Sequence, residues 1–439
     1  MSSVAMIVDA LGQCVTETAR QHARSSGFCR RSSKVDAATF CEGLIFGWLQ
    51  HPDASVPQLA QMLAVRGVSV TPQGLDQRFT PAATRLLSEV LRAVATVGIP
   101  ADAPVAIPLL QRFAAVDVDD SSSVSLPDAL APEWSGCGGS SGGTAAVKLQ
   151  VRLDLCRGTL TGPFLQDGRA PDKTAPMQES TVVPNTLRVT DLGFFSLAHL
   201  RARSAAQAYW LTRFQPQTVV YDATGTRWTP LDLPTLLEAQ GCDVVELRIT
   251  LGVRDRIPCR LVAVRVSEEI AQARRTRLRH RAHRKKQAVS PASLALAGWT
   301  ILVTNAALTA AEALVLLRAR WQIEQLFRRW KDQGRIDEWR SANPWRILCE
   351  VYAKLIGCVI QHWLTSQTWE HPDRSLTNAA QVVRDHAIRL ACVFRSRRSL
   401  AQAIRTIHAC LGVGCRINPR RRHPNTYQRL LNPTLEALA

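Results

Sequence analysis

Alternation of apolar and polar side chains marks the clearest strand of the chain, from Val147 to Leu155. Every second residue there is Val or Leu, and Lys, Gln, Arg and Asp occupy the positions between them. This period of two predicts a strand with one buried face. Gly158 follows, and the β-prone segment from Thr159 to Leu165 then predicts the second strand of a hairpin.

Two shorter apolar segments run into acidic residues. The segment from Ala114 to Val118 leads to Asp119 and Asp120, and the segment from Leu187 to Thr190 leads to Asp191. Each predicts a short strand with a carboxylate at its end. Neighbouring residues of a strand point to opposite faces, so Asp119 and Asp120 cannot both serve one site if the strand continues.

Residues 208–300 are rich in β-branched and aromatic side chains. The segments QAYWLTRF, QTVVYDA, DVVELRITLGV and CRLVAVRV predict strands. A helix is predicted from Glu268 to Gln287, and Thr300 to Thr304 predicts one more strand.

The first hundred residues have a helical pattern. Two short helices, 55–65 and 72–79, follow each other in the order of a helix-turn-helix, with Thr71 as the cap of the second. The second helix offers Gln73, Gln77 and Arg78 to a DNA groove. Plain packing of short helices explains the same pattern.

A long helix is predicted from Thr309 to Lys331. Thr309 and Glu312 have the spacing of a capping box, in which each side chain satisfies an N–H group of the first turn. No Pro or Gly interrupts the segment, and Gly334 ends it.

One face of this helix carries Arg320, Glu324 and Lys331 within a narrow arc. A solvated Arg320–Glu324 pair worth about 0.2–0.5 kcal/mol is the ordinary interpretation. The alternative is a metal-binding Glu324 among basic residues, including Arg328 and Arg329, that hold a phosphate backbone. That alternative requires further carboxylates elsewhere in the chain.

Composition favours a polyanionic partner. The 439 residues contain 54 Lys and Arg against 36 Asp and Glu, which gives a net charge of +18 and a pI of about 10.0. Basic residues cluster in RRTRLRHRAHRKK, which ends with Arg284, Lys285 and Lys286, and again in 395–398 and 416–422. We expect contacts with phosphates from the first cluster.

Other classes of protein are disfavoured. The 12 Cys form no CxxC pair, so a structural zinc site is not expected. Neither a signal peptide nor an uninterrupted apolar run of about 20 residues is evident. We therefore expect a cytoplasmic protein that has reduced thiols and no membrane partner.

The predicted helix from Thr309 to Lys331 resembles part of a known family. The order Arg320, three residues, Glu324, six residues, Lys331 resembles the Y-(2)-R-(3)-E-(6)-K signature of the IS4 family of DDE transposases. Leu317 stands where that family has Tyr.

The two acidic segments are also similar to motifs of this family. Asp120 with two serines after it resembles the first motif, D-[SG]-[ST], although Asp117 and Asp119 compete with it on residue type alone. Asp191 in DLGFF resembles the second motif, D-x-G-Y/F-F. Asp172, in the polar loop GRAPDK, is the other candidate for the second acid.

The resemblance implies a catalytic triad of Asp120, Asp191 and Glu324 that holds two Mg²⁺ ions, for which Mn²⁺ can substitute. Arg320 and Lys331 would then contact scissile-strand phosphates. It also implies that Trp299 stacks on an extruded base, although a Trp at the start of a strand is more often a core residue.

The implied fold is α/β: an RNase H-like mixed-sheet catalytic core with a β-strand insertion, flanked by helical N-terminal and C-terminal regions. The expected division is residues 1–100, a helical DNA-binding domain; 101–207, the first part of the core; 208–300, the insertion; 301–370, the second part of the core; and 371–439, a basic helical region.

The implied activity is cut-and-paste DNA transposition by the transposase of an IS4-type insertion sequence. The implied location is the cytoplasm of a bacterium, in association with the nucleoid. Its partners would be double-stranded DNA, as terminal inverted repeats and as target, and a second copy of the chain in the synaptic complex. Two other functions fit the residues: a catalytically decayed DNA-binding protein that occupies element ends, and an RNase H-like nuclease without end specificity.

Overall fold

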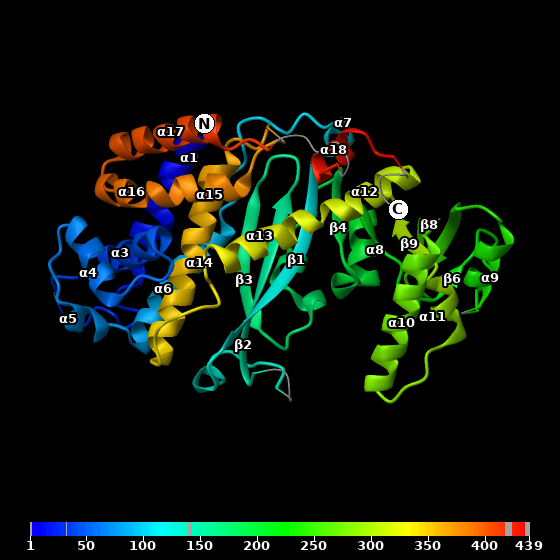
Figure 1. Cartoon of the computed structure of the whole chain (residues 1–439), viewed down its shortest axis with the longest axis horizontal. Helices are drawn as coiled ribbons and strands as arrows, with labels where there is room; N and C mark the ends of the chain where they lie inside the picture. Colours follow the sequence, from blue (N-terminus) through cyan, green and yellow to red (C-terminus); the bar gives the residue numbers. More distant parts are fainter. Residues whose placement is uncertain are drawn as a thin grey trace. The chain divides into compact units, whose positions relative to one another are not determined.

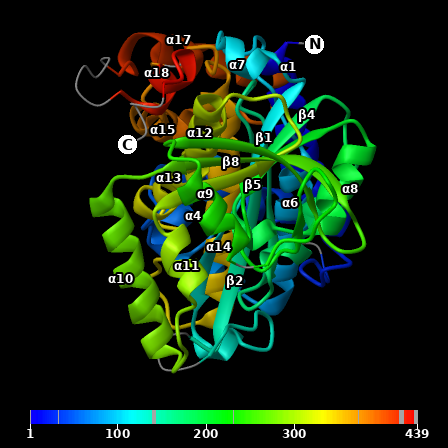
Figure 2. The same cartoon turned by 90° about the vertical axis from the view of Figure 1, so that its right-hand side faces the viewer.

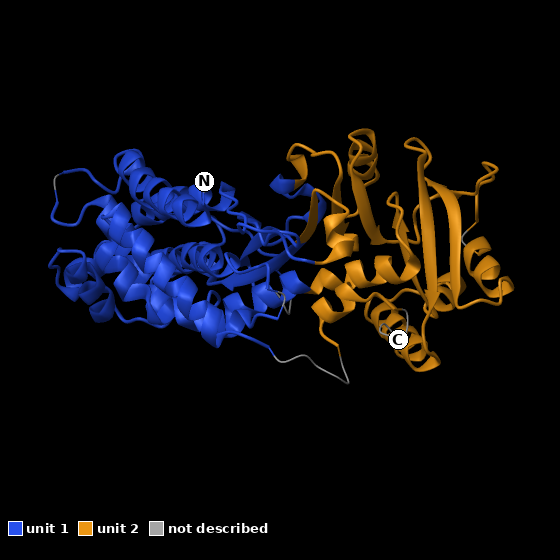
Figure 3. Ribbon diagram, turned by 90° about the horizontal axis from the view of Figure 1, so that it is seen from above, with its two compact units in different colours: residues 1–106, 120–177, 322–418 blue, residues 107–119, 178–321, 419–439 orange. Residues whose placement is uncertain are grey.

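The computed structural model describes residues 2–31, 33–138, 143–229, 231–371, 373–417 and 424–434. The chain divides into two compact units (Figure 3). Unit 1 comprises 1–106, 120–177 and 322–418, and unit 2 comprises 107–119, 178–321 and 419–439. The expected basic cluster at 416–422 lies partly outside the described residues.

Unit 1 combines N-terminal and C-terminal helices with a β-hairpin (Figure 1). Its helices are α1 (Ser3–Ala10), the π-helix η1 (Leu11–Glu17), α2 (Thr18–His22), α3 (Ala37–Gln50), α4 (Val56–Val65), α5 (Pro72–Asp76), α6 (Pro81–Thr96), most of α13 (Trp321–Asp332), α14 (Pro344–Ser366), α15 (Leu376–Asp385), α16 (Ala387–Val393) and α17 (Arg397–Gly414), with the 3-10 turns η2 (Asp128–Leu130) and η3 (Asp172–Thr174).

The centre of unit 1 is α14, which packs against α3, α6, α15, α17 and β3. It is long and apolar enough to span a membrane, but 94% of its apolar window is buried inside the protein. Burial on all sides explains why its sequence is apolar all round. The N-terminal helices therefore share a core with the C-terminal ones, whereas the sequence predicted a separate domain at 1–100.

Unit 2 contains most of the sheet and the helices that cover it (Figures 1 and 2). Its helices are α7 (Pro108–Gln111), η5 (Leu192–Phe194), α8 (Leu197–Ala205), α9 (Asp232–Ala239), α10 (Glu268–Arg284), α11 (Pro291–Leu296), α12 (Ala310–Ala319) and α18 (Thr426–Leu431). The 3-10 turn η4 (Pro176–Glu179) begins at the end of the unit 1 segment.

The strands of the described residues follow the order β3-β2-β1-β4-β5-β9-β8-β7-β6. Strands β1, β4 and β5 are parallel neighbours, β2 and β3 form an antiparallel hairpin, and all pairs from β5–β9 to β7–β6 are antiparallel. Their bounds are β1 (Ala115–Leu126), β2 (Ala145–Asp154), β3 (Leu160–Asp167), β4 (Thr186–Thr190), β5 (Tyr209–Arg213), β6 (Val220–Tyr221), β7 (Val244–Leu251), β8 (Ile257–Arg265) and β9 (Trp299–Thr304).

The predicted hairpin, both acid-flanked strands and the basic helix α10 are confirmed. Strand β1 is longer than expected, because it continues through Asp119 and Asp120 to Leu126. The segment QAYWLTRF was assigned to the insertion but forms β5, which is a parallel neighbour of β4. Strands β6 to β9 then extend the same sheet.

The predicted helix from Thr309 to Lys331 is two helices. The capping box of Thr309 and Glu312 is present at the start of α12. Helix α12 ends at Ala319 and α13 begins at Trp321, so Arg320 lies at the break. The break falls where the chain leaves unit 2 for unit 1, because Trp321 is the last residue of one segment and Gln322 the first of the next.

Candidate active site

Two neighbouring aspartates of β1 have different surroundings. Asp119 is fully buried, and its Oδ2 lies 3.5 Å from Nε of Arg188 and accepts a hydrogen bond of 3.1 Å from Gln178. Asp120 is half-buried, and its Oδ1 accepts the N–H of Ser121 at 2.8 Å. Because the strand continues, the two side chains point to opposite faces. Asp119 is therefore part of a buried ion pair, which leaves Asp120 as the more accessible carboxylate.

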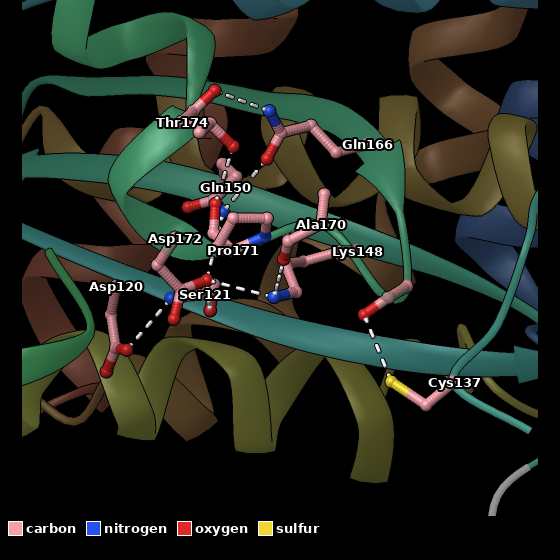
Figure 4. Close-up of polar contacts among 11 residues, drawn as sticks. Asp120, Ser121, Cys137, Lys148, Gln150, Gln166, Ala170, Pro171, Asp172 and Thr174 are labelled. Atoms are coloured by element: carbon pink, nitrogen blue, oxygen red, sulfur yellow. Dashed lines mark hydrogen bonds and ion pairs between the residues drawn. The ribbon is translucent and has the colours of Figure 1, made fainter.

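A polar network lies beside Asp120 in unit 1 (Figure 4). The hydroxyl of Ser121 donates to Oδ1 of Asp172 at 2.8 Å. The same oxygen lies 3.1 Å from the Lys148 ammonium and 3.2 Å from the Gln150 amide nitrogen, both on β2. Asp172 thus belongs to the surroundings of Asp120 and of the β2–β3 hairpin.

Asp191 follows β4 and begins the 3-10 turn η5. Its Oδ1 accepts the N–H of Leu192 at 2.8 Å, and its Oδ2 lies 3.9 Å from the Arg320 guanidinium. Side-chain exposure is 44% for Asp191 and 14% for Arg320. The pair belongs to unit 2. Arg320 thus faces a carboxylate at the C-terminal end of the parallel strand β4.

Helix α13 places Glu324 and Lys331 in unit 1, as it does Asp120. The Lys331 ammonium donates to the carbonyl of Ser123, three residues after Asp120, at 3.0 Å. This contact joins α13 to β1. Glu324 is half-buried. It lies seven residues before Lys331, a rise of about 10 Å along the helix.

The other basic residues of α13 differ in exposure. Arg328 is exposed, whereas Arg329 is half-buried. Arg329 lies near enough to the buried His362 of α14 to help lower the pKa of that imidazole. Leu317, at the Tyr position of the signature, is 8% exposed in α12. Its side chain is therefore part of the apolar packing of that helix.

Trp299 lies in the core of unit 2, with 3% exposure. Its indole N–H donates to Glu238 at 3.1 Å, and the Arg265 guanidinium lies 4.4 Å from the ring centroid. These contacts favour the core role that the sequence left open. Base stacking by Trp299 stays a prediction and would require the ring to become more accessible.

A basic cavity of about 660 Å³ lies between α10 and the sheet of unit 2. Arg274 donates to the Trp299 carbonyl and the Thr300 hydroxyl and so holds α10 on β9. Burial lowers the pKa of the Arg274 guanidinium, and Arg213 and Arg277 nearby lower it further. The cavity lining that carries this positive charge includes Arg213, Arg274, Arg277, Arg281 and Arg284.

The end of α10 is accessible. Arg284, Lys285 and Lys286 are all exposed, and Arg284 is the last residue of the helix. Basic side chains at a helix C-terminus are favoured by its partial negative charge. The cluster can therefore reach an anionic partner.

The predicted recognition helix is short. Helix α5 ends at Asp76, so Gln77 and Arg78 lie in the turn after it. Gln73 and Gln77 are exposed, whereas Arg78 donates to the Ser33 hydroxyl and lies over the Phe28 ring. Thr71 caps α5 through the Gly74 N–H, as predicted. A helix of five residues presents less surface to a groove than the sequence suggested.

Asp120, Asp191 and Glu324 are all carboxylates, and carboxylate oxygens are the donors that suit a hard cation. Within the described ranges, however, no three His, Cys, Asp or Glu side chains are grouped closely enough to hold a metal ion. Asp120 and Glu324 belong to unit 1 and Asp191 to unit 2. The sequence did not predict the hydrogen bonds that Asp172 makes with Ser121, Lys148 and Gln150. The segment GRAPDK contained a candidate acid, but spacing alone could not show that this loop folds onto β1 and β2.

The strand order β3-β2-β1-β4-β5, with one aspartate on β1 and another directly after β4, defines an α/β protein with an RNase H-like core. The chain belongs to the transposase DDE domain family, which matches residues 118–359, more than half of its length. The matched range includes Asp120, Asp191 and Glu324.

Several insertion-sequence transposases are similar to the chain along most of its length. The transposase for insertion sequence element IS231D of Bacillus thuringiensis subsp. finitimus is 27% identical over 434 residues, 91% of this chain and 88% of the relative. That for IS231F of B. thuringiensis subsp. israelensis is 27% identical and covers 80% and 78%. That for IS1151 of Clostridium perfringens is 21% identical and covers 77% and 76%.

Proposed function

We propose that this protein is the transposase of an IS4-type insertion sequence. It would bind the terminal inverted repeats of its element, cleave DNA there and join the ends to a target. The observation that carries the proposal is the coincidence of the R-(3)-E-(6)-K spacing with one aspartate on β1 and another directly after β4, all inside the matched domain. Full-length similarity to insertion-sequence transposases supports it.

Asp120, Asp191 and Glu324 are the proposed catalytic carboxylates, and they would hold Mg²⁺. Bound Mg²⁺ would supply charge stabilisation for the displacement at a phosphodiester. Two local contacts support the assignment. Lys331 joins α13 to β1 beside Asp120, and Arg320 faces Asp191.

The basic side chains have a separate proposed task. Arg320 lies 3.9 Å from the Asp191 carboxylate, and Lys331 contacts the carbonyl of Ser123, three residues after Asp120. Both would hold the phosphates of the scissile strand. The exposed cluster at the end of α10 would bind the backbone of the flanking duplex without reading its sequence, because phosphate contacts carry no direct base information. Two copies of the chain would bring two element ends together.

Glu324→Gln tests the carboxylate assignment. This change removes the charge and adds little volume, so we expect nicking of DNA that carries the element's terminal repeats to fall at least about 1000-fold. Loss of an essential group of a catalytic unit has effects of this size. Binding to the same DNA should stay within about twofold of wild type. The readouts are gel-based nicking with Mg²⁺ and fluorescence anisotropy.

Glu338→Gln is the matched control, because Glu338 follows α13 and its side chain is 63% exposed. It should nick DNA at the wild-type rate. Undiminished nicking by Glu324→Gln would remove this residue from the site. If wild-type protein binds the ends without nicking, a DNA-binding role is favoured; if it nicks every duplex equally, a nuclease without end specificity is favoured.

A further inference from the structure

Asp172 contacts Ser121, the residue that follows Asp120 on β1, and its carboxylate also contacts Lys148 and Gln150. We propose that Asp172 is a positioning residue that fixes the Asp120 carboxylate through Ser121. The inference rests on the proposed function, since it assigns Asp172 a role in the strand cleavage for which Asp120 is proposed. All three residues belong to unit 1.

Ser121 links the two carboxylates. Its backbone N–H donates to Asp120 at 2.8 Å, and its hydroxyl donates to Asp172 at 2.8 Å. The side chains of Asp120 and Asp172 lie on either side of Ser121 in Figure 4. A shift of Ser121 therefore changes the hydrogen bond that orients Asp120.

Asp172 is itself anchored on the hairpin. Lys148 binds its carboxylate and also the carbonyl of Ala170, which fixes the loop before it. Gln150, which is fully buried, binds the same carboxylate oxygen. Gln166 of β3 donates to the carbonyl of Thr174, which fixes the loop after Asp172. The carboxylate thus has a fixed position relative to β2 and β3.

These contacts argue against a metal-binding role for Asp172. Its Oδ1 already accepts from Ser121, Lys148 and Gln150, and the Lys148 ammonium lies 3.1 Å away. A cation placed there would be repelled by that ammonium. Asp172 was a candidate for the second catalytic acid by residue type, and its contacts instead suit it to hold Ser121.

The expected consequence is a moderate loss of rate. Groups that orient metal-binding side chains typically change affinity or activity by about 10–100-fold when they are removed. Asp172→Asn keeps the shape and removes the charge that holds Ser121 and Lys148. Ser121→Ala removes the hydroxyl but leaves the contacts of Asp172 with Lys148 and Gln150 in place. Both variants should lose nicking rate by this factor.

The experiment compares the full-length single variants, the double variant Asp172→Asn/Ser121→Ala, and Asp167→Asn as control. Asp167 is a half-buried carboxylate at the end of β3, where it accepts the Ser135 N–H at 3.1 Å and makes no described contact with Ser121. Nicking rate, the Mg²⁺ concentration for half-maximal rate, DNA affinity and the thermal unfolding midpoint are measured for each protein.

We expect both single variants to need about 10-fold more Mg²⁺ for half-maximal rate, with unchanged DNA affinity and unfolding midpoint. The double variant should be no slower than the slower single variant, because residues that act through one another are non-additive. The control should match wild type.

Three results would overturn the role: additive losses, wild-type nicking by Asp172→Asn, or a loss equal to that of Asp120→Asn together with a harmless Ser121→Ala. The last would identify Asp172 as a ligand itself. An inactive wild-type protein would instead overturn the proposed function on which the role rests. If Asp172→Asn unfolds, Ser121→Ala alone is compared with wild type: a wild-type rate and wild-type Mg²⁺ requirement would overturn the role.

Discussion

Individual side chains in this protein acquire their roles from burial more than from type. Asp119 and Asp120 are chemically identical neighbours, yet one is fully buried against Arg188 and the other is half-buried beside Ser121. A carboxylate inside the protein must be paired because an isolated buried charge is costly. The pair with Arg188 therefore assigns a structural task to Asp119.

His362 shows the same effect for a titratable group. It is 6% exposed in α14, and its Nε2 lies 2.7 Å from the Gly158 carbonyl in the turn between β2 and β3. Burial lowers the pKa of this imidazole to about 4, which the hydrogen bond to Gly158 only partly opposes. A neutral ring that donates to the carbonyl satisfies both observations.

The free energy of unfolding should therefore fall as pH drops from about 6.5 to about 4. In this window His362 is protonated in the unfolded chain but not in the folded protein. The lowered pKa therefore stabilises the folded state above pH 6.5, and this stabilisation is lost as the pH falls. The contribution is about 3 kcal/mol. Urea unfolding at pH 7.5 and pH 4.5 measures it.

His362→Gln keeps an N–H donor but cannot protonate, so this part of the pH dependence should disappear from the variant. His371→Gln, whose side chain is 50% exposed in wild type, is the control. An identical pH dependence in wild type and His362→Gln would contradict the prediction.

A buried ion pair on α14 also holds the turn that follows α13. Lys354 of α14 binds Glu350 one turn earlier at 2.7 Å, with both side chains below 5% exposure. The same ammonium donates to the carbonyls of Arg335 and Glu338, which lie after α13. Burial raises the pKa of Glu350 and lowers that of Lys354, and each partner opposes the shift of the other. This contact fixes the turn that follows the Glu324 helix to the core helix.

Lys354→Met should lower the free energy of unfolding by about 3–5 kcal/mol, because it leaves the Glu350 carboxylate buried without its cation. The double variant Glu350→Leu/Lys354→Met should recover much of the loss, since it removes the stranded charge as well. Urea titrations of the three proteins measure both effects. Equal stability of wild type and Lys354→Met would show that the carboxylate finds another partner or water.

At the scale of the whole molecule, the excess of positive charge is the property most relevant to the proposed partner. The net charge of +18 is spread over many Arg residues, but the exposed end of α10 concentrates it in Arg284, Lys285 and Lys286. Contacts between such side chains and phosphates release counterions, so affinity depends on salt.

Changing these three residues to Ala should reduce the slope of log affinity against log salt by about 2–3, because each lost phosphate contact removes about 0.9. Anisotropy with a duplex of unrelated sequence at several NaCl concentrations measures the slope. The control triple, Arg389→Ala, Arg398→Ala and Arg405→Ala, removes the same charge from exposed positions on α16 and α17. Equal slopes for both triples would indicate a general charge effect without contacts by α10.

Much of the fold was accessible from local patterns. Alternation in Val147–Leu155 gave β2, and the capping-box residues Thr309 and Glu312 gave the start of α12. These signals are short-range, because strand period and helix caps depend on residues a few positions apart. The helix break at Arg320 was missed, since its backbone angles remain helical and no Gly or Pro marks it.

For the candidate site, the sequence supplied the residues and their family pattern. It did not separate Asp117, Asp119 and Asp120 by type alone, and it placed Asp172 as a rival of Asp191. The structure distinguishes Asp119 by its burial against Arg188 and links Asp172 to Ser121. The structure also shows that Trp299 is buried, and no rule of residue spacing predicts this burial.

The sequence by itself determined the main strands and the basic character, because periodicity and composition are properties of the chain. It supplied the α/β class and the motif residues only through the family resemblance. Only the tertiary structure decided which carboxylates are buried, that the N-terminal helices share a core with α14, and that the Asp172 loop folds onto β1 and β2. Those outcomes depend on contacts between residues far apart in the chain, whose free energies no local pattern contains.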